Sequence, residues 1–319
     1  MDINLTSMER DVQTPEELRV RVADFIRENG MTQDKTAKEA GMSTAALNQW
    51  LQNKYRGDNV VMEAKLTIWL SSRERRTATV QSLPIAADYV ATPSGERIKA
   101  VLTYAQMAAD LAVIYGGAGV GKTKATRSYA ASNPNVWIST MRPDTANVAS
   151  CLEEIGEAVG TKTGSRAARL SRDICRRIEG TGGLLIIDEA QALSVPAIES
   201  IRSIHDATGV GLVLCGNESV YARFTGGSRA ATFAQLFSRI GKRLRLNRPS
   251  MKDVAVLADA YHVAGAAERG ALFDISQKPG ALRAVTKTLR LAAMFAAGQG
   301  LPLALPHIMA AWKDLGGEA

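Results

Sequence analysis

A glycine-rich segment that ends in a lysine and a threonine is the clearest place in this sequence where chemistry can occur. Residues 116–123 read GGAGVGKT and match the pattern G-x-x-x-x-G-K-[ST] at every position. Glycines let main-chain N–H groups close around phosphate oxygens, and a helix that follows adds positive potential at its N-terminus. The pattern predicts a nucleotide-binding loop made of Gly116, Gly117, Ala118, Gly119, Val120, Gly121, Lys122, Thr123 and Lys124.

The end of this loop and two carboxylates further along the chain have complementary chemistry. Lys122 would reach the β- and γ-phosphates of ATP, and the Thr123 hydroxyl would ligate Mg²⁺. The four apolar residues 184–187 lead into Asp188 and Glu189, which is typical of a Walker B strand. Asp188 would hold magnesium through its water shell, and Glu189 would act as general base on the attacking water. The predicted cofactors are ATP and Mg²⁺, and the predicted reaction is hydrolysis to ADP and phosphate.

Strands and helices that alternate from Leu111 onward would position these groups. After Pro249 the pattern is helical to the end of the chain, which predicts a separate helical lid. Short apolar strands separated by helices predict a parallel sheet that is covered on both faces. The five strands are predicted at 111–115, 135–139, 184–187, 211–215 and 243–246.

These motifs, in this order, resemble the AAA+ ATPases over residues 93 to about 300. The resemblance implies that Asn217, after the fourth strand, is a sensor-1 residue that contacts the γ-phosphate or the attacking water. A helix N-cap is the alternative, because Asn-Glu-Ser begins the next helix. It also implies that Arg283, in Gly-Ala-Leu-Arg at the start of a lid helix, is a sensor-2 residue that contacts the phosphates. An ordinary exposed helix arginine is the alternative there.

The same resemblance implies an arginine finger, which completes the nucleotide site of a neighbouring subunit. Arg239 stands where the family places this residue, at the end of a helix before the fifth strand. Arg223, Arg229 and Arg243 compete for the role. In this family each active site is completed by the next protomer, so ATP would control assembly into a helical filament or ring.

The segment 32–50 resembles the helix-turn-helix of phage repressors. Ala37 allows close approach of two helices, Gly41 takes the turn, and Leu47 and Trp50 pack inward. Asparagine and glutamine can form paired hydrogen bonds with adenine edges, so base contact is chemically possible. The exposed residues of the second helix are predicted to be Ser43, Thr44, Asn48 and Gln49. A helical protein-contact module is the alternative.

Charge is distributed unevenly along the chain, whose formal net charge is +7. Residues 1–76 hold 12 basic and 12 acidic residues, so the surplus lies in the part that carries the nucleotide motifs. A basic surface attracts polyanions such as double-stranded DNA. A helix at 165–179 would present Arg166, Arg169, Arg172 and Arg176 on one face, either to DNA phosphates or only to solvent. Thr140 and Arg142 would face a central channel in an assembled ring or helix.

Composition predicts the domain boundaries and the location. After the basic residues 73–76, two prolines and the absence of any period predict a linker. The expected parts are a helix-turn-helix domain at 1–76, a linker at 77–93, an AAA+ core at 94–249 and a lid or C-terminal domain at 250–319. Neither a signal peptide nor a long apolar stretch is present in the sequence, so we expect a cytoplasmic protein with no membrane partner.

The complete pattern is a small all-α helix-turn-helix domain, an α/β AAA+ P-loop core with Asp-Glu-Ala-Gln at 188–191, and a helical lid. In this order the parts resemble the family of Mu B-like phage transposition proteins over nearly the whole chain. The resemblance implies an ATPase that binds DNA largely without sequence preference and forms filaments on target DNA. It would deliver that DNA to a DDE transposase, stimulate strand transfer and support target immunity.

Other functions fit the same motifs. A helicase loader or replication-initiation ATPase would also bind ATP, DNA and a partner protein. A transcriptional regulator would use the helix-turn-helix to read one operator. Related Asp-Glu-Ala-Gln AAA+ proteins serve secretion or envelope assembly, but those usually carry a transmembrane segment.

Overall fold

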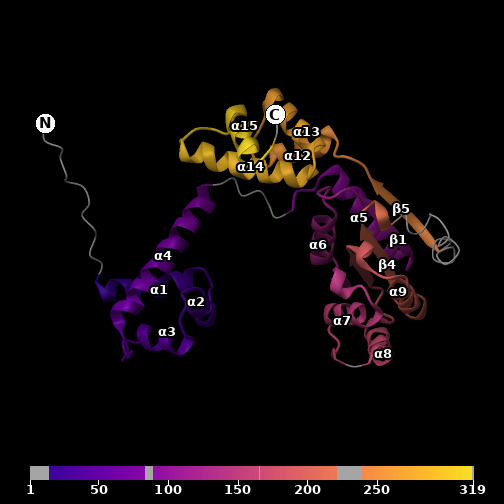
Figure 1. Ribbon diagram of the computed structural model, residues 1–319, viewed down its shortest axis with the longest axis horizontal. Coiled ribbons are helices and arrows are strands. Elements are labelled where there is room, and N and C mark those ends of the chain that lie inside the picture. The colour runs from indigo at the N-terminus through magenta and orange to yellow at the C-terminus, as the bar shows by residue number, and fades with distance from the viewer. Residues whose placement is uncertain (1–13, 83–88, 165, 221–238, 318–319) are drawn as a thin grey trace. The chain divides into compact units, whose positions relative to one another are not determined.

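The computed structural model describes residues 14–82, 89–164, 166–220 and 239–317 (Figure 1). The chain divides into two compact units, one ending at Ser82 and the other beginning at Leu83. Each unit has hydrophobic core residues of its own. The two are therefore described separately.

The N-terminal unit is a bundle of four helices. Their bounds are α1 (Pro15–Glu28), α2 (Gln33–Glu39), α3 (Thr44–Leu51) and α4 (Asn59–Ser82). The Thr32 and Ser43 side chains cap α2 and α3, and Gly41 turns the chain between them at φ +68°. Leu47 and Trp50 are fully buried, as the helix-turn-helix pattern predicts. The predicted all-α domain is confirmed.

Helix α4 is longer than the sequence pattern suggested. The predicted linker began at residue 77, but the helix continues to Ser82, so that part of the prediction is wrong. The reason is the absence of glycine and proline from residues 73–82, where threonine, serine and valine replace the charged residues without breaking the helix.

The second unit is built on a five-stranded sheet with the order β2-β3-β4-β1-β5, in which all neighbouring strands are parallel. Helices cover both faces: α5 and α6 on one, and α7, α8 and α9 on the other. The predicted α/β core is confirmed. The strands are β1 (Leu111–Gly116), β2 (Val136–Thr140), β3 (Leu184–Asp188), β4 (Gly211–Gly216) and β5 (Ile240–Leu246). The helices are α5 (Pro93–Met107), α6 (Lys122–Ser132), α7 (Val148–Val159), α8 (Ala167–Ile178) and α9 (Val195–Thr208).

The strands are apolar on both sides because side chains alternate between the two covered faces. In β1, Leu111 and Val113 pack towards α7, α8 and α9, whereas Ala112 and Ile114 pack towards α5 and α6. Strand β5 begins three residues before its predicted start at residue 243. A register irregularity between Leu111 and Ala112 accommodates this extension, in which Gly241 lies against the Asp110 carboxylate.

The C-terminal part of this unit is the predicted helical lid. It consists of α12 (Met251–Asp259), α13 (Ala266–Gln277), α14 (Ala281–Gly298) and α15 (Leu305–Asp314). Val285, Leu289 and Ile308 are fully buried in a hydrophobic core that these helices share. Among the described residues, no helix combines the length and apolar character needed to cross a membrane.

A buried carboxylate connects the lid to the sheet domain. Asp253, in the first turn of α12, accepts hydrogen bonds from the backbone N–H of Ser94 at 2.8 Å and of Ser250 at 2.9 Å. The two serine hydroxyls donate to the same carboxylate, at 3.1 Å and 2.7 Å respectively. Burial alone would raise the pKa of Asp253, but these donors outweigh it and hold the pKa below its ordinary value. The N-terminal ends of α5 and α12 are thereby held together.

Candidate nucleotide-binding site

The glycine-rich loop connects β1 to α6 at the carboxyl edge of the sheet. Gly116, Gly119 and Gly121 have φ values of +155°, +82° and +98°, which side-chain-bearing residues rarely adopt. A Cβ atom on Gly116 would also lie 2.4 Å from the Leu246 carbonyl oxygen of β5. The loop therefore needs these glycines both for its curvature and for its packing.

Lys122 begins α6, and its side chain turns back into the loop. The Nζ atom donates to the carbonyl oxygens of Gly116 at 2.8 Å and Gly117 at 2.9 Å. Burial lowers the pKa of Lys122, while the nearby carboxylates of Glu189 and Asp188 act in the opposite direction. The ammonium group thus lies at the centre of the loop, where phosphate oxygens would face it. Lys124 lies two residues after Lys122 in α6 and is exposed.

The two predicted magnesium ligands are in contact. Asp188 is buried at the end of β3, and its Oδ2 accepts a hydrogen bond from Thr123 Oγ1 at 2.7 Å. Its Oδ1 accepts from the backbone N–H of Glu189 at 3.0 Å. A hydroxyl and a carboxylate that share one position are hard oxygen donors of the kind that Mg²⁺ binds together with water. The donor set therefore fits the expected ion.

The predicted general base is held by a neighbouring amide. Glu189 has a φ of +55°, unusual for a residue with a side chain, and its Oε2 accepts a hydrogen bond from Gln191 Nε2. Gln191 Oε1 in turn accepts from the backbone N–H of Asn217 at 3.2 Å. Gln191 was not among the predicted site residues. Its position in the Asp-Glu-Ala-Gln sequence was the available signal.

Asn217 lies where the sensor-1 residue was expected, at the end of β4. Its Oδ1 accepts hydrogen bonds from the N–H of Ser219 at 2.9 Å and from the Ser219 hydroxyl at 2.6 Å. The side chain therefore caps the helix that begins at residue 218, which was the alternative assignment. A sensor role would use the remaining amide nitrogen.

The lid meets the loop through main-chain atoms. The backbone N–H of Arg283, in the first turn of α14, donates to the Gly119 carbonyl oxygen at 3.2 Å. A Cβ atom on Gly119 would lie only 1.9 Å from the Gly280 carbonyl oxygen, so the two glycines are in close contact. The Arg283 side chain is exposed next to the loop. This adjacency fits its predicted sensor-2 role.

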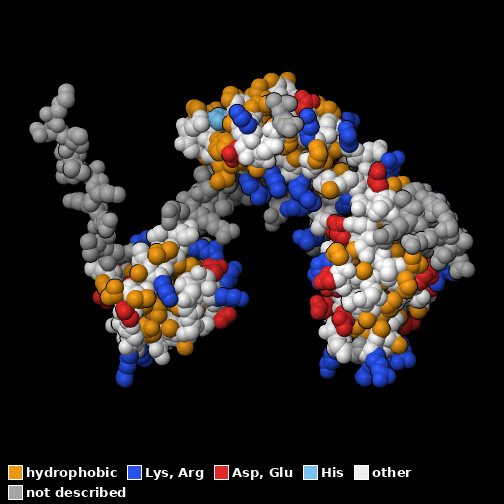
Figure 2. Space-filling view, viewed as in Figure 1, with side chains coloured by type: hydrophobic (Ala, Val, Ile, Leu, Met, Phe, Trp, Pro, Cys, Tyr) orange, Lys and Arg blue, Asp and Glu red, His pale blue; other side chains and the backbone are white. Residues whose placement is uncertain are grey.

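Two further basic residues extend from Arg283 along α14. Lys287 and Arg290 are exposed and follow at positions four and seven residues further on, which places them on one helix face. Figure 2 shows Lys and Arg side chains gathered along the side of the lid where α14 runs. Neither residue was among the predicted DNA contacts, although their helical spacing from Arg283 in the sequence indicates a shared basic face.

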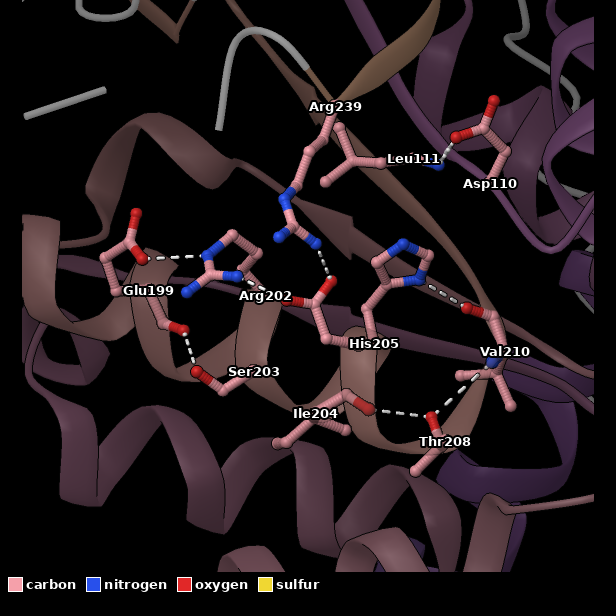
Figure 3. Close-up of polar contacts among 11 residues, drawn as sticks. Asp110, Leu111, Glu199, Arg202, Ser203, Ile204, His205, Thr208, Val210 and Arg239 are labelled. Carbon is pink, nitrogen blue, oxygen red and sulfur yellow. Dashed lines mark hydrogen bonds and ion pairs between the residues drawn. The ribbon is translucent and has the colours of Figure 1, made fainter. Parts of the chain in front are cut away.

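Arg239, the candidate arginine finger, lies directly before β5, at the amino ends of the strands, whereas the loop lies at their carboxyl ends. Its Nη1 is 2.8 Å from Asp206 Oδ1, and Arg202 binds the second oxygen of the same carboxylate (Figure 3). Arg239 is therefore not part of the site in its own chain. Of its competitors, Arg223 and Arg229 lie outside the described residues, and Arg243 lies within β5.

The predicted DNA-contact residues of α3 differ in their availability. Ser43 caps the helix, and the Thr44 hydroxyl donates to Asp34 at 2.9 Å. Asn48 and Gln49 are exposed on the following turn. Any contact with base edges by this helix would depend mainly on those two amides.

The remaining predicted DNA contacts lie on the sheet domain. Thr140 is exposed at the end of β2, and Arg142 pairs with Glu154 at 2.6 Å and with Asp144 at 3.3 Å. The arginines of α8 are exposed, and Figure 2 shows Lys and Arg side chains gathered at the end of the domain formed by α8. They include Arg169, Arg172 and Arg176, and Arg166, also exposed, directly precedes the helix.

Comparison with known proteins gives matches along most of the chain. The family described as "Mu B transposition protein, C terminal" matches residues 238–315, and the family described as "AAA domain" matches residues 105–224. The "ATP-dependent target DNA activator B" of Escherichia phage Mu is 38% identical over 300 residues, 94% of this chain and 95% of that protein. The "Mu-like prophage FluMu DNA transposition protein B" of Haemophilus influenzae is 35% identical over 271 residues, 84% and 93% of the two chains.

Solved structures share the fold at lower identity. The Aeropyrum pernix ORC2 protein is 16% identical with a TM-score of 0.51, and the match covers 69% of this chain and 66% of that one. Domain III of the Thermotoga maritima replication initiation protein DnaA is 16% identical with a TM-score of 0.50, covering 71% and 94%. At this identity the likeness describes the arrangement of the sheet and lid.

Proposed function

This chain belongs to the Mu B family of phage transposition proteins, and from that premise we propose that it is an ATPase which carries target DNA to a transposase. It would bind double-stranded DNA largely without sequence preference, assemble on it as a filament when ATP is bound, and present it to a DDE transposase. The transposase would use that DNA as the target of strand transfer, in the cytoplasm of the bacterial host. ATP hydrolysis would cause the filament to disassemble and would support target immunity.

The observation that carries this proposal is the meeting of four chemical groups at the carboxyl edge of the sheet. Magnesium-bound ATP would supply the γ-phosphoryl group that water attacks. Lys122 would stabilise charge that develops on the phosphate oxygens, and the contacting pair Thr123 and Asp188 would hold the metal ion. Glu189, one residue beyond Asp188, would orient the attacking water and accept its proton.

Assembly is supported by the separation of Arg239 from its own nucleotide loop. Because the loop lies at the carboxyl ends of the parallel strands and Arg239 at their amino ends, Arg239 is suited to serve the loop of another subunit. Such a head-to-tail contact uses two different surfaces and extends into a helix unless the rotation closes a ring. Many weak basic contacts along that assembly would then bind DNA with high avidity.

The basic residues of α8 and α14 support contact with the DNA backbone. Their side chains are exposed, and arginine and lysine bind phosphates without reading the base sequence. Binding of this kind releases counterions, so it should weaken steeply as salt increases. The exposed amides of α3 would add at most a modest sequence preference.

Electron microscopy of the protein mixed with random-sequence duplex DNA tests the proposal directly. Samples with ATP, with ADP and with ATP plus the Lys122→Ala variant would be compared at one protein concentration. We expect continuous filaments only for the unmodified protein with ATP. Discrete particles at one DNA site would instead favour a transcriptional regulator. The absence of any DNA-bound assembly would contradict the target-carrier function and favour a helicase loader.

A further inference from the structure

We propose that Gln191 is a positioning residue for ATP hydrolysis, whose side-chain amide fixes the Glu189 carboxylate to the end of strand β4. The inference rests on the proposed hydrolysis at this site. It adds a residue that lies outside the phosphate loop, the magnesium ligands and the two sensor positions. Two hydrogen bonds of its side-chain amide and the buried Gly216 beside it assign this role.

The first observation is the direction of the two hydrogen bonds. A short 3₁₀ turn, Ala190–Ala192, follows Glu189 and brings the Gln191 side chain back over it. The amide nitrogen donates to Glu189 Oε2, and the amide oxygen accepts from the Asn217 backbone N–H at 3.2 Å. Rotation of the amide by 180° would place two donors together and two acceptors together. The orientation of the amide is therefore determined by its two partners.

The second observation explains why residue 216 is a glycine. Gly216 is the last residue of β4 and is buried, and its backbone does not require positive φ. A Cβ atom there would lie 2.4 Å from Gln191 Oε1 and 2.3 Å from Val220 Cγ2. The absence of a side chain at residue 216 thus leaves the space that the Gln191 amide uses to reach Asn217.

Together these contacts give the general base a fixed orientation. A carboxylate that is held by one amide loses rotational freedom, and a neutral donor does so without neutralising its charge. Because the other end of the amide is held by the Asn217 backbone, a shift of that residue would be transmitted to Glu189. The end of β4, where the predicted sensor-1 residue Asn217 lies, is thereby coupled to the group that activates water.

Nuclear magnetic resonance of the full-length, nucleotide-free protein tests the contacts themselves. Glu189→Ala should shift the side-chain amide resonances of Gln191. Gln191→Ala should shift the backbone amide resonance of Asn217 and accelerate exchange of that proton with solvent, because its acceptor is removed. If neither resonance responds, the proposed arrangement is wrong, whatever the protein's function.

Steady-state kinetics tests the role. Gln191→Ala should lower kcat for ATP by about tenfold or more, because a loosely held base is misplaced for much of the time. The KM for ATP and the dissociation constant of a fluorescent ATP analogue should stay within about twofold, since no nucleotide contact is removed. An unchanged kcat, or a loss of ATP affinity in proportion to the loss of rate, would overturn the proposal.

A glycine variant perturbs the same amide from its other side. Gly216→Ala is made in a Val220→Ala background, so that only the clash with Gln191 remains, and it is compared with Val220→Ala alone. It should lower kcat as Gln191→Ala does. A combined variant, which carries Gln191→Ala together with Gly216→Ala in the same background, should have a kcat no lower than either change gives alone, because both changes act on one amide. Gly298→Ala, where a new Cβ meets no atom within 4 Å, is the control.

Three results separate this inference from the function on which it rests. Fully additive losses in the combined variant would overturn the role of Gln191 while leaving ATP hydrolysis and DNA delivery intact. Unimpaired hydrolysis by Glu189→Gln would overturn both the general base and its positioning residue. A protein that hydrolyses ATP but forms no filaments would contradict the target-carrier function only, and the effects of Gln191→Ala would still support the inference.

Discussion

At the scale of single residues, Gly119 shows a requirement that the nucleotide-binding pattern does not contain. The pattern accepts any residue at this position, yet the loop has a φ of +82° there and contacts the Gly280 carbonyl of the lid. A Cβ atom on Gly117, in the same loop, would meet no atom within 4 Å, and the φ of Gly117 is not positive. Two glycines of one motif thus have different constraints.

Gly119→Ala should therefore weaken ATP binding and lower the melting temperature, whereas Gly117→Ala should have much smaller effects. Strain at positive φ alone costs about 1–3 kcal/mol, and separation of the lid from the loop adds to that cost. Titration with a fluorescent ATP analogue and a thermal melt would measure both. Equal effects of the two substitutions would contradict both the strain at residue 119 and the contribution of the lid contact.

The buried cysteines make a second prediction at this scale. Burial raises the pKa of the Cys151 thiol to about 12 and that of Cys215 further still, with smaller contributions from nearby carboxylates. At pH 8 the thiolate fraction of Cys151 would be on the order of 10⁻⁴, so alkylation should be very slow. Mass spectrometry after iodoacetamide treatment should find both residues modified only in denaturant. Rapid modification of the folded protein would contradict the burial.

At the scale of helices and strands, the hydrogen bonds by which Asp253 connects α5 to α12 predict how stability depends on pH. Its pKa lies below the ordinary value of 3.8, so the folded state gains stability from the ionised carboxylate. That contribution is complete well above the unfolded-state pKa and is lost as the pH falls through the lower, folded-state value. Stability of the sheet-and-lid unit should therefore decline below about pH 4 in part through this group.

The substitution Asp253→Ala should remove that part of the pH dependence and destabilise the unit at pH 7. The loss should be about 1–3 kcal/mol, because two backbone N–H groups and two hydroxyls lose their acceptor. Urea unfolding between pH 3 and pH 7 would measure it. Asp274→Asn, an exposed substitution in the same lid, is the matched control and should leave the profile unchanged.

The elements themselves could be predicted wherever a periodic apolar signal was present. Strands β1 to β4 were predicted to within one residue at each end, because their side chains are buried on both faces. The start of β5 was not, since Gly241 and Lys242 resemble a loop until Asp110 is seen beside them. The end of α4 could not be predicted from composition, because polar residues continue the helix to Ser82 where neither glycine nor proline interrupts it. The pairing of Gln191 with Glu189 and Asn217 depends on side-chain directions that spacing does not contain.

At the scale of the whole molecule, the position of Arg239 predicts complementation between two defective proteins. Arg239→Ala keeps its own loop, and Lys122→Ala keeps its Arg239, which lies at the opposite end of the strands. A mixture of the two should recover DNA-dependent ATP hydrolysis, because some Arg239→Ala subunits gain an arginine from a neighbour.

A mixture of Lys122→Ala with Glu189→Gln is the matched control. It should recover nothing, since both changes lie in the same site of each chain. Phosphate release would be measured over a range of mixing ratios. Full activity of Arg239→Ala alone, or no recovery in its mixture with Lys122→Ala, would exclude Arg239 as the residue that acts between subunits.

Because the nucleotide loop and Arg239 lie at opposite ends of the strands, any such filament would also have two different ends. At one end, Arg239 of the last subunit has no neighbouring nucleotide to contact. At the other end, the ATP of the last subunit is contacted by no arginine from a neighbour. The second end would keep its ATP longest and act as a stabilising cap, while subunits elsewhere hydrolyse theirs. The lifetime of the assembly on DNA would then be set by events at one terminus, and its disassembly would have a direction.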